Sequence, residues 1–203
     1  MSYFPMFIEL KNEDCLVVGG GKIALRKVKM LLDFGAAVTV VAPEILPEIQ
    51  EAEDVRCIQR EFSPADVKGR RLVVAATDSE EQNHKVSRLC KKQRIPVNAV
   101  DQIRDCSFIF PSYLREGEVV SAFSSGGQSP VITQYLKEQI RPHMTEHLGE
   151  TAACLGAIRD VVKHNVAAES KRKQVYQELL GLALEEGTIP SEEEISAIIE
   201  KYK

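Results

Sequence analysis

Three consecutive glycines restrict the fold of this chain more than any other feature of its sequence. Gly19, Gly20 and Gly21 follow an apolar run at residues 15–18 and open a segment with helical spacing. With Ala24 they fit the pattern G-x-G-x-x-A, whose first glycine allows a tight turn and whose second lets the backbone approach a pyrophosphate. Free N–H groups at a helix start favour the same anion. The motif therefore predicts a dinucleotide site that includes Gly19 and Gly21, and the alternative is a tight turn without a ligand.

Apolar runs and helical segments alternate through the first half of the chain. Asp78, with Glu81 three residues later, has nearly the spacing of a capping box. Strands separated by helices of this length indicate βαβ units. The predicted fold class is therefore α/β, with a Rossmann-type parallel sheet. We expect strands at 15–18, 37–41, 72–76 and 96–100, a short strand at 55–58, and helices at 22–34 and 78–93.

The pattern changes after the fifth predicted strand. Residues 107–110 and 118–123 are strand-like, and residues 111–117 are expected to close a hairpin between them. A helix follows from Pro130, with Ser129 as its N-cap and the proline at the first helical position.

The last third of the chain is predicted to be helical. This pattern begins at about residue 151, and Ser191 with Glu194 forms a capping box for the final helix. We place domain boundaries near residues 113 and 148.

Charge and composition exclude several classes of protein. The formal net charge is −4, so a nucleic-acid partner is not expected. Apolar stretches stay shorter than the roughly 20 residues of a membrane span, and the first residues do not have the pattern of a signal peptide. The 5 cysteines form no CxxC pair, which argues against a zinc knuckle or a disulfide framework. The sequence thus predicts a cytoplasmic protein.

Two histidines and one glutamate have open interpretations. His143 and His147 have the spacing of a helical metal pair, but surface histidines are the preferred interpretation and we nominate no metal ligand. Glu44 follows the second strand, where an acid can bind a ribose, and it can equally be a solvated glutamate. No Lys or Arg occupies residues 42–44 to pair with a 2′-phosphate, which favours NAD over NADP.

An ordered set of short motifs resembles one family, the precorrin-2 dehydrogenases, whose module also forms the N-terminal part of multifunctional siroheme synthase. The resemblance covers residues 1 to about 150. Beyond the three glycines, it is carried by Ala24-x-Arg26-Lys27, Gly35-Ala36-x-Val38-Thr39-Val40, Ala75-Ala76-Thr77-Asp78, Val97-Asn98-x-Val100-Asp101, Ser107-Phe108-Ile109-x-Pro111 and Ser124-Ser125-Gly126-Gly127-x-Ser129-Pro130-Val131.

This resemblance implies an activity and an assembly. It implies NAD-dependent oxidation of precorrin-2 to sirohydrochlorin in siroheme biosynthesis, by a homodimer. It also implies a Rossmann domain at 1–113, a small α+β dimerisation region at 114–148 and a helical region at 149–203. Two alternatives stay open: a bifunctional enzyme that also inserts iron, and an NAD-sensing regulatory module without chemistry. Cofactor contacts are implied at Lys22, Ile23, Pro43 and Glu44.

Asp101 is the candidate catalytic residue. It lies at the carboxyl end of a predicted parallel strand, the edge where ligands bind in open α/β sheets. A carboxylate there accepts a pyrrole proton or stabilises a cationic ring. The family's important aspartate falls on this position, and the alternative is a structural aspartate that caps the next turn. Thr77 faces the same edge as a cofactor contact, and Asn98 bonds either cofactor or backbone.

A second loop and several basic residues are candidates for substrate binding. The loop with Ser124, Ser125 and Gly126 offers N–H groups to an anion before a helix, or is a flexible connector. Ser125 also matches a serine that can be phosphorylated in the multifunctional relative. A tetrapyrrole carries carboxylates, so basic side chains are expected beside the motifs. The candidates, each of which can also be a solvated surface charge, are Arg104, Arg115, Lys137 and Arg141.

Overall fold

The computed structural model describes residues 3–203, and it divides into two compact units. Met1 and Ser2, which begin the expected nucleotide-binding region, lie outside the described residues. The first unit ends at Phe110, and the second is Pro111–Lys203. Among residues 3–203, no helix combines the length and the apolar character that a membrane span requires.

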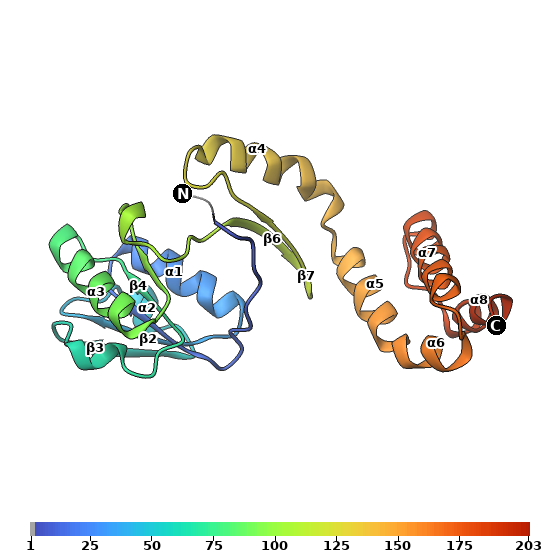
Figure 1. Cartoon of the computed structure of the whole chain (residues 1–203), viewed down its shortest axis with the longest axis horizontal. Coiled ribbons are helices and arrows are strands. Elements are labelled where there is room, and N and C mark those ends of the chain that lie inside the picture. The colour runs from blue at the N-terminus through green and yellow to red at the C-terminus, as the bar shows by residue number, and fades with distance from the viewer. Residues whose placement is uncertain (1–2) are drawn as a thin grey trace. The chain divides into compact units, whose positions relative to one another are not determined.

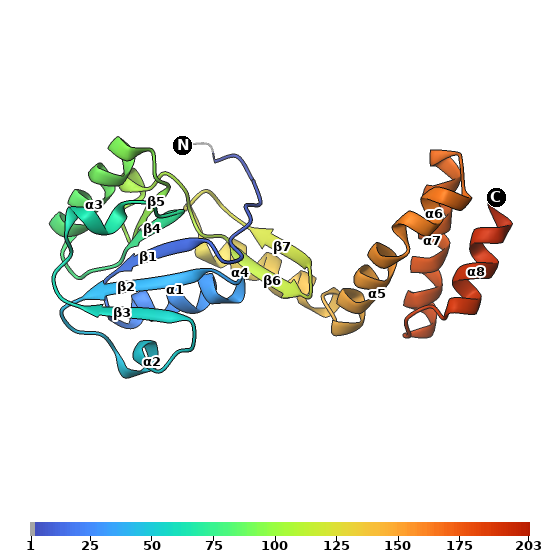
Figure 2. The same cartoon turned by 90° about the horizontal axis from the view of Figure 1, so that it is seen from below.

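The first unit (Figure 1) is built on a sheet of five parallel strands, and their order β3-β2-β1-β4-β5 can be followed in Figure 2. The strands are β1 (Asp14–Val18), β2 (Ala37–Ala42), β3 (Val55–Gln59), β4 (Leu72–Ala75) and β5 (Val97–Ala99). Central β1 pairs with β2 on one side and β4 on the other, so Val17 lies opposite both Val40 and Val74. Strand order reverses at β1, and in open α/β sheets ligands bind outside the carboxyl ends of the strands beside such a point. The predicted fold class is confirmed.

Helices cover both faces of this sheet (Figure 2). They are α1 (Lys22–Asp33) and α2 (Pro47–Gln50) on one face, and α3 (Glu80–Gln93) with the 3-10 helix η1 (Pro64–Val67) on the other. Successive strand residues point to opposite faces. Val17 therefore packs with the α1 side and Leu16 with the α3 side, and both are fully buried. This two-sided burial explains why β1 reads as a continuous apolar run.

The ends of α1 and α3 test two predictions. The expected stop after α1 is confirmed, since Gly35 follows the helix with a left-handed φ of 71°. The expected cap of α3 at Asp78 is wrong. Ser79 is the N-cap, because its side-chain oxygen accepts a hydrogen bond from the backbone N–H of Gln82.

The second unit begins with an antiparallel hairpin, β6 (Ser112–Glu116) and β7 (Val119–Phe123). The strand predicted at 107–110 is wrong, and the hairpin turn is shorter than the predicted 111–117. The reason is tertiary. Ser107 bonds the backbone of Val97 in β5, and the rings of Phe108 and Phe110 pack against the core beneath α1.

Helices make up the rest of the second unit, as predicted. Their caps at Ser129 and Ser191 are confirmed, and Glu194 completes the predicted capping box. A core containing Val162, Val175 and Leu179 joins the helices that follow residue 145. The elements are α4 (Pro130–Ile140), the 3-10 helix η3 (Arg141–His143), α5 (Glu146–Ala157), α6 (Arg159–Asn165), α7 (Glu169–Glu186) and α8 (Glu192–Lys201).

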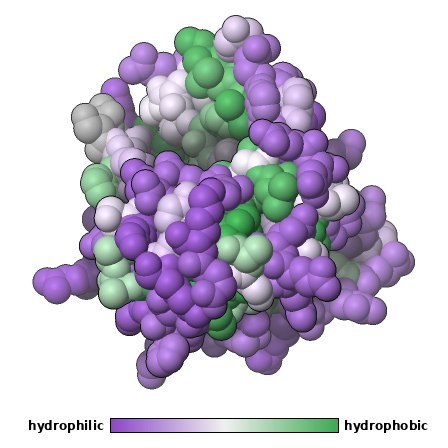
Figure 3. Space-filling model, turned by 90° about the vertical axis from the view of Figure 1, so that its right-hand side faces the viewer, coloured by the Kyte–Doolittle hydropathy of each residue, from purple (hydrophilic) through white to green (hydrophobic). Residues whose placement is uncertain are grey.

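Helix α4 leaves its apolar side chains exposed. They are between 36% and 77% exposed to solvent, and α4 buries none of its described residues. Apolar side chains gather at the top of Figure 3, where α4 lies. The exposed residues are Val131, Ile132, Tyr135, Leu136 and Ile140, which we call the α4 face.

Candidate active site

The glycine loop lies at the carboxyl end of β1 and is closely packed on two sides. A Cβ on Gly19 would lie 2.2 Å from the carbonyl oxygen of Ala76, and one on Gly20 would lie 2.1 Å from that of Glu44. Gly19 also has a φ of 123°, which side chains rarely adopt. The first two glycines are therefore required by the fold itself.

The third glycine is different, because the space beside it is open. No described atom lies within 4 Å of the position that a Cβ on Gly21 would take. Gly21 is also the N-cap of α1, which has no side-chain cap and no acidic residue in its first turn. The N–H groups of that turn are thus open to an anion. An uncapped helix start beside open space fits the pyrophosphate of a dinucleotide.

The predicted cofactor residues surround this loop. Lys22 and Ile23 form the first turn of α1, with Lys22 exposed and Ile23 packed against the core. Pro43 and Glu44 are exposed directly after β2. The backbone N–H of Leu46 donates to the carbonyl oxygen of Gly20, and this bond links the glycine loop to the segment after β2. The structure therefore brings both sets of residues together at one edge of the sheet.

Thr77 follows β4 at the same edge, and it bonds the buried Asn83 as well as the backbone of Ser79. Its backbone N–H and its hydroxyl both donate to Oδ1 of Asn83, at 3.0 and 2.8 Å. The amide of Asn83 in turn donates to the carbonyl oxygen of Thr77 at 2.9 Å. Sequence reasoning missed Asn83, which is only 3% exposed within α3. A polar residue on the buried face of a helix was the available signal.

Asp101 lies just beyond β5 and is exposed. Its φ is 60°, in the left-handed region, which costs a residue with a side chain roughly 1 kcal/mol. Its carboxylate makes no hydrogen bond or ion pair with any described residue, so it is open to a ligand. Backbone bonds hold its neighbours: Val100 N–H donates to Ala75 O at 2.9 Å, and Gln102 N–H to Ala99 O at 3.3 Å.

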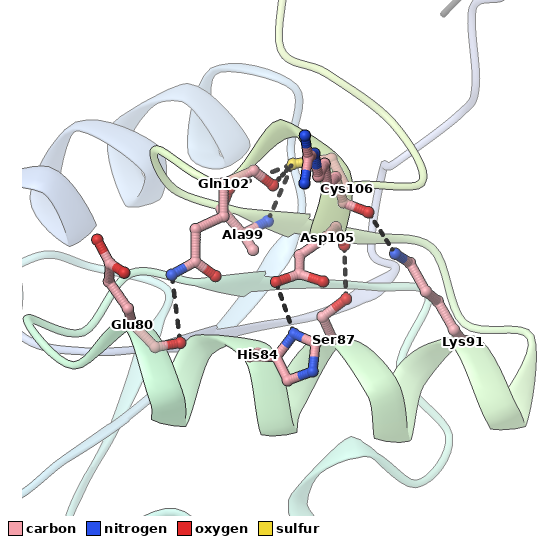
Figure 4. A network of polar contacts seen from close by, with 9 residues as sticks. Glu80, His84, Ser87, Lys91, Ala99, Gln102, Asp105 and Cys106 are labelled. Carbon is pink, nitrogen blue, oxygen red and sulfur yellow. Dashed lines mark hydrogen bonds and ion pairs between the residues drawn. The ribbon is translucent and has the colours of Figure 1, made fainter.

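A polar network ties the turn after Asp101 to α3 (Figure 4). Oδ2 of Asp105, in the 3-10 helix η2 (Ile103–Asp105), lies 2.8 Å from Nδ1 of His84. The hydroxyl of Ser87 donates to the carbonyl oxygen of Asp105 at 2.5 Å, and Gln102 donates to Glu80 O at 3.2 Å. We call these contacts the η2 clamp. They stabilise the turn that carries Asp101, and sequence reasoning missed them because they join residues about 20 positions apart.

Cys106 makes further hydrogen bonds to the backbone of the turn that carries Asp101. Its sulfur accepts from the backbone N–H of Ala99 at 3.3 Å and donates to the carbonyl oxygen of Ala99 at 3.2 Å. Burial raises the pKa of the Cys106 thiol, and hydrogen bonding to Ala99 opposes that rise. The thiol is therefore a neutral structural group here. Arg104 lies in η2 and is exposed, and its carbonyl oxygen accepts from Lys91 Nζ at 3.0 Å.

The side chain of Asn98 bonds the backbone, which was one of its two predicted roles. It is buried in β5, and its amide donates to the carbonyl oxygen of Phe108 at 3.1 Å. The side chain thus holds the segment that follows η2 against the sheet.

The loop before α4 is a compact turn in the second unit. The Ser125 hydroxyl accepts from the backbone N–H of Ser129 at 2.9 Å and donates to its carbonyl oxygen at 3.1 Å. Ser124 accepts from the N–H of Gly126 at 3.1 Å, and Gly126 has a φ of 65°. Both hydroxyls therefore bond within the turn itself, and anion binding by this loop stays a prediction.

The two histidines of the second unit differ in their surroundings. His147 lies 2.9 Å from the carbonyl oxygen of Ala183 in α7, which gives it a structural partner, while His143 is exposed in η3. Within the described residues, no group of three His, Cys, Asp or Glu side chains is arranged to hold a metal ion.

Comparison with known proteins identifies the family of the first unit. Residues 6–112 match the family model described as "Putative NAD(P)-binding". The chain belongs to this family. The match spans the whole five-stranded sheet and the turn that carries Asp101.

Two curated relatives extend the similarity beyond the nucleotide-binding unit. The chain is 41% identical over 184 residues to siroheme synthase 3 of Aeromonas hydrophila, covering 89% of this chain and 39% of that protein. It is 42% identical over 183 residues to siroheme synthase of Thioalkalivibrio sulfidiphilus, covering 89% and 37% respectively. The chain thus spans about two fifths of the length of these relatives.

One solved structure matches the chain over almost its full length. SirC, a precorrin-2 dehydrogenase, is 26% identical with a TM-score of 0.70, covering 98% of this chain and 100% of that one. The resemblance drawn from the sequence motifs is therefore confirmed.

Proposed function

We propose that this protein is an NAD-dependent dehydrogenase that oxidises precorrin-2 to sirohydrochlorin. The observation that carries the proposal is the unpartnered carboxylate of Asp101, held at the same sheet edge as an uncapped helix start behind the glycine loop. Similarity to SirC over 98% of the chain supports the substrate, and the absence of Lys or Arg at residues 42–44 supports NAD over NADP.

The cofactor is expected to bind along the carboxyl ends of β1, β2 and β4. The first turn of α1 binds the pyrophosphate through backbone N–H groups, and Glu44 accepts from the ribose. When bound, NAD⁺ accepts the hydride that leaves the macrocycle. The proposed contacts are Gly19, Gly21, Lys22, Ile23, Pro43, Glu44 and Thr77.

Asp101 takes the proton in this scheme. Loss of a hydride from carbon leaves a cationic ring, and a pyrrole N–H must then lose its proton. An exposed carboxylate with no protein partner is free to accept that proton and to stabilise the cation before it leaves. The η2 clamp holds the residues after Asp101, and the bond from Val100 N–H to Ala75 O holds the residue before it, so the backbone is fixed on both sides of Asp101.

Assembly and location complete the proposal. The exposed α4 face supports a homodimer formed by the region 114–148. The cytoplasmic location rests on the cysteine pattern and the composition. Substrate contacts at Arg104, Ser124, Ser125 and Gly126 stay predictions.

An anaerobic assay with precorrin-2 and NAD⁺ tests the activity through NADH formation. We expect wild type to form NADH and Asp101→Asn to be slower by about 10²–10⁴-fold, the usual contribution of a general base. Asp78→Asn is the matched control, because Asp78 is an exposed carboxylate just beyond β4 at the same edge. NAD⁺ affinity, measured by calorimetry, should be equal in all three proteins.

The other outcomes distinguish the alternatives. No NADH from wild type, with NAD⁺ binding intact, would contradict the dehydrogenase and leave the sensor. Addition of Fe²⁺ or Co²⁺ after oxidation tests the bifunctional alternative, since only a chelatase accelerates metal insertion into the product.

A further inference from the structure

A lysine of α1 lies over an aromatic ring near the proposed reaction edge. The ammonium nitrogen of Lys27 is 4.2 Å from the ring centroid of Phe110. Phe110 makes an edge-on contact with Phe108, with 5.2 Å between ring centroids. Both rings pack against the core beneath α1. The ammonium is thus held at the margin of an apolar surface, where it gains some cation–π stabilisation.

This ammonium has no acceptor. Lys27 is partly buried, yet it makes no hydrogen bond or ion pair with any residue in the described part of the chain. Burial lowers the pKa of Lys27 and the charge of Arg26 lowers it further, whereas Cys106 and Asp101 act in the opposite direction. A partly desolvated cation without an anion is unfavourable unless a ligand supplies the anion.

The position of Lys27 on α1 directs its side chain toward the ligand edge. Side chains of a helix tilt toward its N-terminus, and here the N-terminus of α1 is the end beside the glycine loop. Lys27 is the sixth residue of α1, about 7–8 Å along the axis from Lys22 at a rise of 1.5 Å per residue. It is therefore removed from the N–H groups that bind a pyrophosphate. The ring beneath it, Phe110, contacts Phe108, whose carbonyl oxygen accepts from Asn98 in β5, so the ammonium lies near the segment that follows β5.

We propose that Lys27 and Phe110 form a subsite for one peripheral carboxylate of the macrocycle, with the ammonium pairing the carboxylate and the phenyl ring contacting the adjacent apolar carbons. The inference rests on the proposed function. It adds a residue that selects an anionic macrocycle and orients it while Asp101 faces the ring nitrogens. The substrate class is a conjugated ring that carries carboxylate side chains.

Binding of an octacarboxylate porphyrin, measured by fluorescence without turnover, tests the subsite. We expect Lys27→Met to weaken binding about tenfold or more, the usual range for a lost charge-assisted hydrogen bond, and Lys27→Arg to retain most of the affinity. Lys29→Met, an exposed lysine on the same helix, is the matched control and should bind as wild type does. A tetracationic porphyrin of the same ring size should not lose affinity in Lys27→Met.

Companion measurements separate this subsite from a structural or cofactor role. The melting temperature and NAD⁺ affinity of Lys27→Met should match those of wild type, and its KM for precorrin-2 should rise more than kcat falls. Equal porphyrin affinity in wild type and Lys27→Met overturns the inference, as does a loss of NAD⁺ affinity as large as the loss of porphyrin affinity. Lys27→Gln replaces Lys27→Met if the latter unfolds. Failure of wild type to form NADH contradicts the proposed function alone, because porphyrin binding is read separately.

Discussion

The two units of this protein treat their apolar side chains in different ways. In the first unit, both faces of the sheet are covered, and residues such as Leu16 and Val17 are fully buried. In the second, a core around Val162 and Leu179 joins the last helices, but α4 buries none of its described residues and only Leu114 is buried in the hairpin. The exposed large apolar side chains of the first unit lie in residues 4–8 and at Ile103, while in the second unit the whole apolar face of α4 is exposed, as is typical of an interaction surface.

The residues proposed for catalysis and those proposed for dimerisation lie in different units. The glycine loop and Asp101 belong to the unit with the continuous core, where a rigid sheet fixes the ends of its strands. The α4 face belongs to the second unit, where we propose that a second copy of the chain binds. Changes in the first unit should therefore alter folding and cofactor binding, and changes in α4 should alter association alone.

The largest effect is expected from Gly20→Ala. The new Cβ would lie 2.1 Å from Glu44 O and 2.7 Å from Ile45 Cα, so backbone must move, and we expect a loss of about 3 kcal/mol or more in the free energy of unfolding. Gly21→Ala is the matched control. Its methyl enters open space and should cost about 1 kcal/mol or less, yet weaken NAD⁺ binding. Urea unfolding and calorimetry measure both, and equal stability of the two variants would contradict a closely packed loop.

The next effect concerns the α4 face. Tyr135→Glu should weaken dimerisation by about 30-fold or more, because a buried aromatic anchor typically contributes at least about 2 kcal/mol. Gln139→Glu adds a charge to an exposed polar position of α4 and serves as the control. Sedimentation velocity gives the association constant. A wild type that is monomeric at all concentrations would contradict the role of the α4 face in dimerisation. A loss of NAD⁺ affinity in Tyr135→Glu would contradict the assignment of cofactor binding to the first unit alone.

A smaller, pH-dependent effect is expected at Asp66 in the first unit. Two hydrogen bonds from Arg60, at 2.6 and 2.8 Å, hold the pKa of Asp66 below its usual value, although burial opposes this. The carboxylate therefore stabilises the fold above its unfolded pKa, and this contribution is lost as the pH falls through the lower folded pKa. Asp66→Asn should cost about 1 kcal/mol at pH 7 and progressively less toward pH 3.

Unfolding by urea across this pH range measures the Asp66 effect. Glu53→Gln is the control, since Glu53 is exposed and makes no hydrogen bond or ion pair within the described residues. A cost that stays constant with pH would mean that Asp66 acts through packing rather than charge.

The smallest effect is expected at Ser191, the N-cap of α8. Ser191→Ala removes one half of a capping box and should cost about 1 kcal/mol in stability. Ser196→Ala, at an exposed position inside the same helix, should be neutral or slightly stabilising, because alanine is the better helix former. Thermal unfolding gives both values. A change of NAD⁺ affinity in either variant would contradict the separation of the two units.

Local patterns predicted most of the elements correctly. The five parallel strands, the helix after the glycines and the caps at Ser129 and Ser191 depend on interactions within a few residues, so the sequence displays them directly. The error at residues 107–110 has the opposite cause. Phe108 and Phe110 look like a strand, but their rings are drawn onto the core beneath α1, and the strand forms at Ser112–Glu116 instead.

The candidate site was only partly predicted, because local patterns reveal some of its residues while contacts between distant segments position the others. The glycine loop and Asp101 end apolar runs that the sequence reveals. Asn83, Lys27 and the η2 clamp were not predicted as site features, because each acts on a residue from a distant segment.

The sequence by itself determined most of the segments that become strands and helices and which end carries the glycine turn, because periodicity and capping are local properties. Only the tertiary structure decided the strand order, the left-handed conformation of Asp101 and the approach of Lys27 to Phe110. These features depend on packing between segments that are far apart in the chain. Such packing selects among several arrangements that the local sequence permits equally.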